Sequence, residues 1–179
     1  MKGRLIVLDH HKGQQIAALM VDGRLDDVWF DTEAPRPGTI YRAIADRPVK
    51  GMGGMFVKTP DGPGFLRQAK GLSPGQPILV QLTSYAEPGK GLPLTQKILF
   101  KSRFAIVTPN APGLNISRSI RDEEQRETLM AIAHSEMGKS DMGLILRSCC
   151  VTADSSAIAE DINAMADLAT QILAEQTGV

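Results

Sequence analysis

The sequence is poor in cysteine, and its two cysteines are neighbours in the chain. Cys149 and Cys150 have no further cysteine with which to pair, so the sequence provides neither a disulfide framework nor a cysteine-rich zinc site. Free cysteines usually behave as small apolar residues, so we expect both thiols to be buried. The sequence also lacks an apolar run long enough to span a bilayer, and it does not begin with a cleavable signal. We therefore expect a cytoplasmic protein with no membrane partner.

Acidic residues are scarce in the middle of the chain, although the formal net charge is zero. Residues 36–121 contain thirteen basic side chains and three acidic ones, whereas residues 122–179 contain three basic and eleven acidic ones. Between Pro88 and Arg121 there is no acidic residue at all. Such a basic block is typical of proteins that bind a polyanion such as nucleic acid, because neutralised phosphates release counterions. The alternative is a solvated face whose charges pair with the acidic C-terminal region.

Short strands separated by glycine and proline turns are predicted for the first half of the chain. Residues 4–10, 14–22 and 24–31 have strand patterns, and the Asp22-Gly23 dipeptide between the last two tolerates the positive φ of a two-residue hairpin. Further short strands follow the break APRPG, at residues 39–46, 53–59, 64–66 and 77–85. About five short strands with this punctuation favour a small barrel of the OB type.

The second half of the chain combines strands with helices. Residues 103–109 and 142–148 are apolar enough to be inner strands, and residues 121–137 between them have a helical pattern. In residues 152–178 apolar side chains recur every three or four positions, which is the period of an amphipathic helix. The predicted fold class is therefore α+β. We divide it into an N-terminal β meander (1–35), a five-stranded OB-type barrel (36–93), a small α/β subdomain (94–151) and a C-terminal helix (152–179).

Two of the five phenylalanines stand on either side of one turn, although aromatic residues make up only 4% of the chain. If the strands that carry Phe56 and Phe65 are neighbours, both rings can lie on the outer face of the barrel and stack on the bases of single-stranded nucleic acid. Lys90, in the loop EPGKGLP, would approach the same face. Phosphates would also be held by three nearby basic side chains, Lys58, Arg67 and Lys70. The alternative is that both rings point into the barrel as core residues.

Several short motifs follow one another in a fixed order along the chain. They are GMFVKTPDGPGFL (54–66), GQPILVQLTSYAEPGKGLPLT (75–95), PNAPGLNISRSI (109–120) and MGLILRS (142–148). This order resembles the N-terminal half of the ribonuclease E/G family, and the resemblance covers most of residues 38–176. It implies that the barrel is an RNA-binding OB domain, in which Phe56, Phe65 and Lys90 match the family's RNA contacts.

The resemblance also implies a subdomain that senses the 5′-monophosphate of RNA. Arg147 matches an arginine of that sensor, and Ser148 stands in place of a threonine whose hydroxyl a serine can replace as a donor to phosphate. On an earlier strand, Ser102 stands in place of a glycine and Ile106 in place of a valine. Ser102 departs from the pattern, because its side chain restricts the approach of the backbone. The alternative for Arg147 is a salt bridge to the acidic C-terminal helix.

By the same resemblance, residues 1–35 form the first part of a ribonuclease-H-like subdomain, and the catalytic aspartates that bind magnesium belong beyond Val179. Phosphodiester hydrolysis of this kind needs a metal held by convergent carboxylates, and no carboxylates in the sequence have a suitable spacing. Asp9-His10-His11 comes nearest to a ligand cluster, but a strand directs neighbouring side chains to opposite faces. We therefore expect no catalytic residue, no metal ligand and no cofactor here, with magnesium required only by the missing catalytic half.

These features predict a single-stranded RNA-binding module of a ribonuclease E/G-like protein that acts in RNA processing or decay. Two alternatives stay open. An active magnesium-dependent endoribonuclease would cleave RNA in a reaction that EDTA abolishes. A non-catalytic protein-interaction module would stay bound to an acidic protein partner when excess RNA is added as a competitor. An unpaired sheet edge in residues 1–35 would be a natural place for weak self-association into a homo-oligomer.

Overall fold

The strand patterns of the first half and the helical patterns of the second half are both present in the computed structural model, so the fold class is α+β as predicted. The structure describes residues 2–31, 34–49, 51, 53–69, 71–138 and 140–175. The chain divides into two units, Met1–Pro35 and Arg36–Val179. Within the described ranges no helix is long and apolar enough to cross a membrane.

The N-terminal unit is a three-stranded antiparallel meander, as predicted. Its strands are β1 (Arg4–His11), β2 (Gln14–Val21) and β3 (Arg24–Phe30), in that order across the sheet. Asp22 and Gly23 have φ values of 50° and 80°, so they form the expected hairpin turn with two left-handed residues. Lys12 and Gly13 turn in the same way between β1 and β2, with φ values of 51° and 81°.

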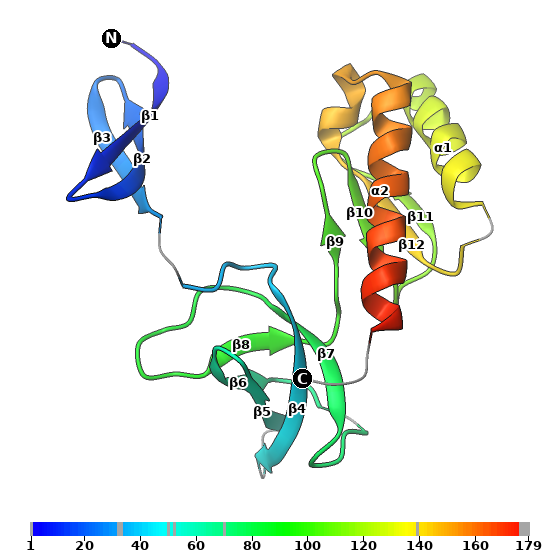
Figure 1. The fold of residues 1–179 in the computed structure, drawn as a ribbon. Coiled ribbons are helices and arrows are strands. Elements are labelled where there is room, and N and C mark those ends of the chain that lie inside the picture. The colour runs from blue at the N-terminus through cyan, green and yellow to red at the C-terminus, as the bar shows by residue number, and fades with distance from the viewer. Residues whose placement is uncertain are drawn as a thin grey trace. The chain divides into compact units, whose positions relative to one another are not determined.

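A closed five-stranded barrel begins the second unit (Figure 1). Its strands are β4 (Ile40–Val49), β5 (Gly54–Thr59), β6 (Gly62–Leu66), β7 (Pro77–Leu82) and β8 (Leu92–Thr95). They follow the order β4-β5-β6-β8-β7 around the barrel, with β6 parallel to β8 and the other neighbours antiparallel. The barrel confirms the OB-type fold class. The predicted strand at 77–85 ends three residues earlier, because residues 83–85 belong to the loop that leads to β8.

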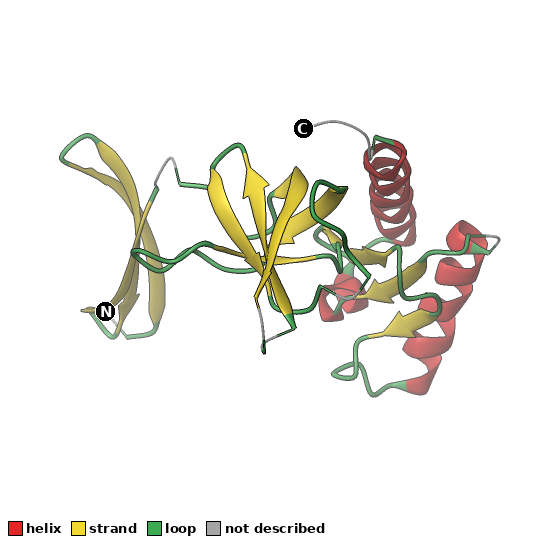
Figure 2. Cartoon of the chain, turned by 90° about the horizontal axis from the view of Figure 1, so that it is seen from below, coloured by secondary structure: helices red, strands yellow, loops and turns green. Residues whose placement is uncertain are grey.

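Residues 100–174 form an α/β subdomain with one sheet and two helices (Figure 2). The sheet order is β11 (Leu114–Ile116), β12 (Gly143–Leu146), β10 (Ala105–Thr108) and β9 (Phe100–Lys101). The helices are α1 (Glu123–Met137) and α2 (Ser155–Ala174), with the short 3-10 helix η1 (Ser148–Thr152) before α2. Asp122 caps α1 by accepting a hydrogen bond from the Gln125 backbone N–H at 2.9 Å.

The two helices and the sheet share one hydrophobic core. Ile158 and Ile162 of α2 are buried in the same cluster as Val107 of β10 and Leu144 of β12. Because the two isoleucines are four residues apart, they lie on the same face of α2, and this face covers the sheet. The two helical segments were predicted, but α2 begins at Ser155 rather than at Thr152, which is the last residue of η1.

The two cysteines differ in burial. Cys150 is 2% exposed and belongs to the core of the subdomain, as expected. Cys149 is exposed, so the expectation of two buried thiols is wrong for this residue. The reason is η1, because consecutive residues of a 3-10 helix point in different directions and only one of the pair can face the core. Burial also raises the pKa of the Cys150 thiol.

Gln81 joins the barrel to the chain that leads into the α/β subdomain. This side chain is 7% exposed, and its amide N–H group donates to the carbonyls of Gly38 and Leu99 at 3.0 Å each. Its oxygen accepts from the Leu99 backbone N–H, also at 3.0 Å. A buried polar side chain is stable only when it is hydrogen-bonded, and Gln81 meets this condition at both ends of its amide. The barrel and the start of β9 are therefore tied together through one residue of β7.

Candidate nucleic-acid interface

Phe56 and Phe65 are direct cross-strand neighbours on β5 and β6. They are paired in the antiparallel register, and their ring centroids are 5.5 Å apart at an interplanar angle of 57°. Met55 and Val57, on either side of Phe56, are 3% and 1% exposed and lie in the barrel core. Because side chains alternate along a strand, the Phe56 ring and its partner ring face outward. Both rings are half-buried and neither is part of the core cluster.

Contacts on both sides hold the ring pair in place. A Cβ atom at Gly54 would lie 2.5 Å from Cζ of Phe65, so only glycine leaves room for this ring against the strand. The guanidinium of Arg47 lies 5.2 Å from the centroid of the Phe56 ring, which is a cation–π contact. The two rings therefore have little freedom to turn inward or to swing away from each other.

A groove of about 1100 Å³ lies beside this ring pair. The strands β5 and β6 and the loop of residues 83–91 between β7 and β8 contribute to its wall. Four of the predicted residues line it, namely Phe56, Phe65, Arg67 and Lys90. In OB folds this face and the loop before the last strand are the parts that contact oligonucleotides.

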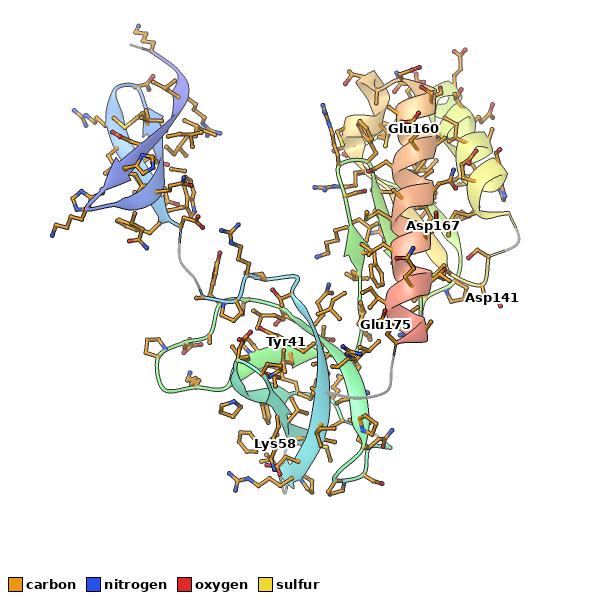
Figure 3. All side chains as sticks on the ribbon, viewed as in Figure 1. Tyr41, Lys58, Asp141, Glu160, Asp167 and Glu175 are labelled. Carbon is orange, nitrogen blue, oxygen red and sulfur yellow. The ribbon has the colours of Figure 1, made fainter. Side chains whose placement is uncertain are left out.

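One predicted phosphate contact, Lys58, does not line the groove. The ammonium group of Lys58 lies 3.5 Å from the Asp46 carboxylate on β4. Figure 3 labels Lys58 on the barrel. Lys70 lies outside the described residues.

The loop that carries Lys90 is closed by an exposed ion pair. Lys90 donates from Nζ to Oε2 of Glu87, and its backbone N–H donates to the Glu87 carbonyl at 3.0 Å. Gly89 allows this turn with a φ of 76°. Since both charged side chains are about two-thirds exposed, the ion pair contributes little and can be exchanged for another anion.

Sequence reasoning missed two residues that line the groove. Tyr85 was assigned to the end of a strand, but it lies in the loop of residues 83–91 and is 59% exposed. Lys97 was noted only as part of the basic block, and it lies just after β8. The scarcity of aromatic residues could have singled out Tyr85, as it did the two phenylalanines.

Tyr41 fixes the turn between the two strands that carry the phenylalanines. It is buried in the barrel and its hydroxyl donates to Oδ2 of Asp61, in that turn, at 2.8 Å (Figure 3). Burial, the hydrogen bond to Asp61 and the negative charge of that carboxylate together raise the pKa of Tyr41 to about 12.

We expect the Tyr41 phenol to keep its proton well above pH 10. A Tyr85→Phe variant leaves Tyr41 as the only tyrosine, so its phenolate absorbance can be followed during a pH titration. The expected midpoint is about 12, compared with 10.0 for an ordinary tyrosine. Because the folded pKa is raised, this group stabilises the fold fully below pH 10, and the contribution disappears as the pH rises to about 12. A midpoint near 10 in the folded protein would contradict the buried hydrogen bond.

Ser102 and Arg147 meet at the turn between β9 and β10. Nη1 of Arg147 donates to the Ser102 carbonyl at 2.6 Å, and the Arg147 backbone N–H donates to the Phe104 carbonyl at 2.8 Å. Ser148 follows as an exposed residue at the start of η1. Within the described chain Arg147 has no carboxylate partner, so the alternative of a salt bridge to the acidic C-terminal helix is not formed there.

The Asp161 carboxylate on α2 organises the same turn. Its Oδ2 accepts hydrogen bonds from the Ser102 hydroxyl and from the backbone N–H groups of Phe104 and Ala105, at 2.5, 2.8 and 3.2 Å. The hydroxyl of Ser102 is therefore occupied within the fold. Asp161 was not singled out from the sequence, because its partners are 56 to 59 positions away in the chain.

Ile106 lies on β10, where it is paired with Ile145 and Lys101 on the neighbouring strands. It is half-buried, whereas Ala105 and Val107 on either side are fully buried in the core. Strand alternation therefore places the Ile106 side chain on the sheet face opposite to that core. Three of the predicted sensor residues are neighbours at one turn, namely Ser102, Arg147 and Ser148. The fourth, Ile106, follows Ser102 by four positions in the chain and lies on β10.

The Asp9-His10-His11 stretch does not gather metal ligands. Oδ1 of Asp9 accepts a hydrogen bond from the His10 backbone N–H at 2.7 Å, and the His11 ring packs edge-on against Phe30. Among the residues that the structure describes, no group of three or more His, Cys, Asp or Glu side chains could hold a metal ion.

Known proteins are similar to this chain over most of its length. The model of the ribonuclease E/G family matches residues 100–178, which contain the α/β subdomain. Ribonuclease E of Synechocystis sp. is 28% identical over 90% of this chain, and Ribonuclease E of Nostoc sp. is 27% identical over 92%. Residues 100–178 are therefore a ribonuclease E/G family domain. The chain covers 26% of the length of both relatives.

A third relative matches a smaller part of this chain. A probable ribonuclease FAU-1 of Staphylothermus marinus is 31% identical over 55% of this chain and 21% of its own length. The alignments with the two Ribonuclease E proteins span the barrel as well as the α/β subdomain, since they leave out at most a tenth of the chain. The similarity to these two relatives therefore covers both parts that carry candidate binding residues.

Proposed function

We propose that this chain binds single-stranded RNA across the groove of its barrel, as the RNA-binding module of a protein that processes or degrades RNA. The observation that carries the proposal is the outward-facing pair of Phe56 and Phe65 beside a groove lined by basic side chains. Stacking of an unpaired base on an exposed ring contributes about 1–3 kcal/mol, whichever base it is. The names of the relatives favour RNA as the polyanion.

The distribution of charge around the groove supports an anionic ligand. Arg67 and Lys97 line the groove, and neither forms an ion pair in the described part of the chain. The acidic residues of the C-terminal region are divided between α1, α2 and the segments next to them, and Figure 3 labels Glu160 and Asp167 on α2 and Glu175 at its C-terminal end. Arg42 and Glu175 form one ion pair between the basic and the acidic regions, at 3.8 Å. The cations of the groove remain available to phosphates.

We also propose that Arg147 tethers the 5′-monophosphate of the bound RNA. The guanidinium is exposed and uses one N–H for the Ser102 carbonyl, so its other donors are available for phosphate oxygens. Ser148 is the adjacent hydroxyl donor. Ser102 contributes its position in the turn rather than its hydroxyl, which Asp161 already accepts.

Fluorescence anisotropy tests the proposal with one short RNA in three forms: single-stranded with a 5′-monophosphate, single-stranded with a 5′-hydroxyl, and annealed to its complement. We expect salt-sensitive binding of both single strands, tighter binding of the phosphorylated one, and weak binding of the duplex. Equal binding of the two single strands would contradict the proposed 5′-phosphate contact of Arg147 and leave the proposed binding in the groove intact. Absence of binding to every form would overturn the proposal. Cleavage of the RNA with magnesium, abolished by EDTA, would instead support the endoribonuclease alternative.

Lys90→Ala is expected to weaken binding of all RNA sequences alike and to flatten its dependence on salt. Each phosphate contact to a single strand contributes about 0.7 to the slope of log K against log salt, so the slope should fall by about that amount. The measurement is anisotropy at a series of salt concentrations. Lys58→Ala is the matched control, because this lysine also forms an exposed ion pair but does not line the groove. An unchanged slope for Lys90→Ala would exclude Lys90 from the binding surface.

A further inference from the structure

Tyr85 is the aromatic residue of the barrel that the fold itself does not use. The described residues of β4 to β8 and their loops contain four aromatic side chains. Tyr41 is in the core and hydrogen-bonded, and the two phenylalanines support each other. Tyr85 is 59% exposed, and it is the one large hydrophobic side chain that is exposed in the described part of the barrel. No hydrogen bond to its hydroxyl occurs within the same part.

The position of Tyr85 is defined by the base of its loop. Two residues before it, Thr83 donates from both its backbone N–H and its hydroxyl to the Pro93 carbonyl on β8, at 2.9 and 3.0 Å. At the other end of the loop, a Cβ atom at Gly91 would lie 3.0 Å from the Pro63 carbonyl oxygen, so the loop passes close to β6. Both ends of the loop are therefore tied to the strands that form the groove.

Tyr85 lines the same groove as Phe56 and Phe65, so three of the barrel's four aromatic side chains border one cavity. An exposed aromatic ring that makes no contact needed by the core leaves apolar surface in water. A nucleobase can cover such a ring at one face, and the tyrosine hydroxyl at its edge stays hydrated. The cations Arg67 and Lys97 border the same cavity and provide partners for the phosphates between bases.

We propose that Tyr85 is a second stacking platform, so that the groove binds a run of consecutive unpaired nucleotides rather than a single flipped base. This inference rests on the proposed function and extends it. One base stacks on the Phe56–Phe65 pair and another on Tyr85, and the strand between them lies against the cations of the groove. A duplex cannot use both platforms, because the faces of its paired bases are already stacked on their neighbours. The ligand class is therefore a flexible, unpaired RNA segment.

Three substitutions at Tyr85 distinguish stacking from other roles. We expect Tyr85→Ala and Tyr85→Leu to weaken binding of a single-stranded oligouridine by roughly tenfold, because both remove the π face, while Tyr85→Phe binds as the unaltered chain does. Anisotropy gives the affinities, and melting temperatures should be unchanged because the side chain is exposed. Photocrosslinking of an oligouridine that contains 5-bromouridine, followed by mass spectrometry of the peptides, should identify Tyr85 as a crosslinked residue.

The possible outcomes separate the inference from the proposed function. If the unaltered chain binds oligouridine but all three Tyr85 variants bind equally well, the second platform is wrong and the groove with its phenylalanine pair stands. If Tyr85→Phe loses as much affinity as Tyr85→Ala, the hydroxyl rather than the ring is the contact, which also overturns stacking. If the unaltered chain binds no single-stranded RNA, the proposed function and the second platform are both overturned.

Discussion

Replacing Phe56 and Phe65 together by alanine should weaken binding of single-stranded RNA by roughly 30-fold or more, because each lost stacking contact costs about 1–3 kcal/mol. The melting temperature should fall by only a few degrees, because the half-buried rings lose their contact with each other but are not part of the core cluster. The two rings face outward, and the residues that fill the barrel at this position are Met55, Val57 and Leu66. Anisotropy with the same RNA and a thermal melt of the same sample measure the two effects.

Val57→Ala is the matched control for the phenylalanine variant. Val57 is 1% exposed and points into the barrel from the position next to Phe56. Its truncation should lower the free energy of unfolding by about 1–2 kcal/mol through loss of buried methyl groups, with little effect on RNA affinity. The opposite pattern, a large drop in melting temperature for the phenylalanine variant with RNA binding retained, would show that the rings act as core residues.

Gly143→Ala should destabilise the α/β subdomain more than any surface substitution. Gly143 begins β12, opposite Thr108 of β10. A Cβ atom there would lie 1.9 Å from the Ala111 carbonyl oxygen and 2.4 Å from Oγ1 of Thr108. The Ala111 carbonyl oxygen accepts a hydrogen bond from the Thr108 hydroxyl at 2.8 Å, so the turn cannot move aside without losing this hydrogen bond. Overpacking of this kind costs about 3 kcal/mol or more, which corresponds to roughly 10 °C in melting temperature.

Asp141→Ala, two residues earlier, is the control for this substitution. Asp141 is exposed and is labelled in Figure 3. Its removal should leave the melting temperature within a few degrees of the unaltered chain, as for most surface positions. Equal melting temperatures for the two variants would contradict the close approach of the turn to β12. The result would also show whether the glycine of the MGLI motif has a packing role.

The barrel could be predicted from local patterns, with one strand missing. Alternation and turn residues located β4 to β7, but not β8, whose sequence LPLT contains a proline. Proline lacks the N–H that most strand positions need, so the residue argued against a strand. Pro93 is tolerated because it contributes only its carbonyl, which accepts two hydrogen bonds from Thr83. Whether a strand can contain this proline depends on the neighbouring strand, so residues 92–95 alone do not indicate it.

Alternation alone left the inward and outward positions of the phenylalanine pair equally open, and the nearby loop with Lys90 favoured the outward one; other parts of the site had no such signal. Alternation places Lys58 on the same strand face as Phe56, but Lys58 does not line the groove and forms an ion pair with Asp46 of the neighbouring strand. Asp161 accepts hydrogen bonds in the turn between β9 and β10 from a helix more than fifty positions further along the chain. Tyr85 is defined by how its loop is tied to β8. Each of these features depends on contacts between distant segments.

Chemical shifts measured on the isotopically labelled chain, during titration with a short single-stranded RNA, test the central claim most directly. Binding across the barrel groove predicts that the largest changes occur in β5, in β6 and in the loop of residues 83–91. Smaller changes are expected at Arg147 when the RNA carries a 5′-monophosphate. Changes confined to the meander of residues 4–30 or to α2, with the groove residues unaffected, would contradict the account.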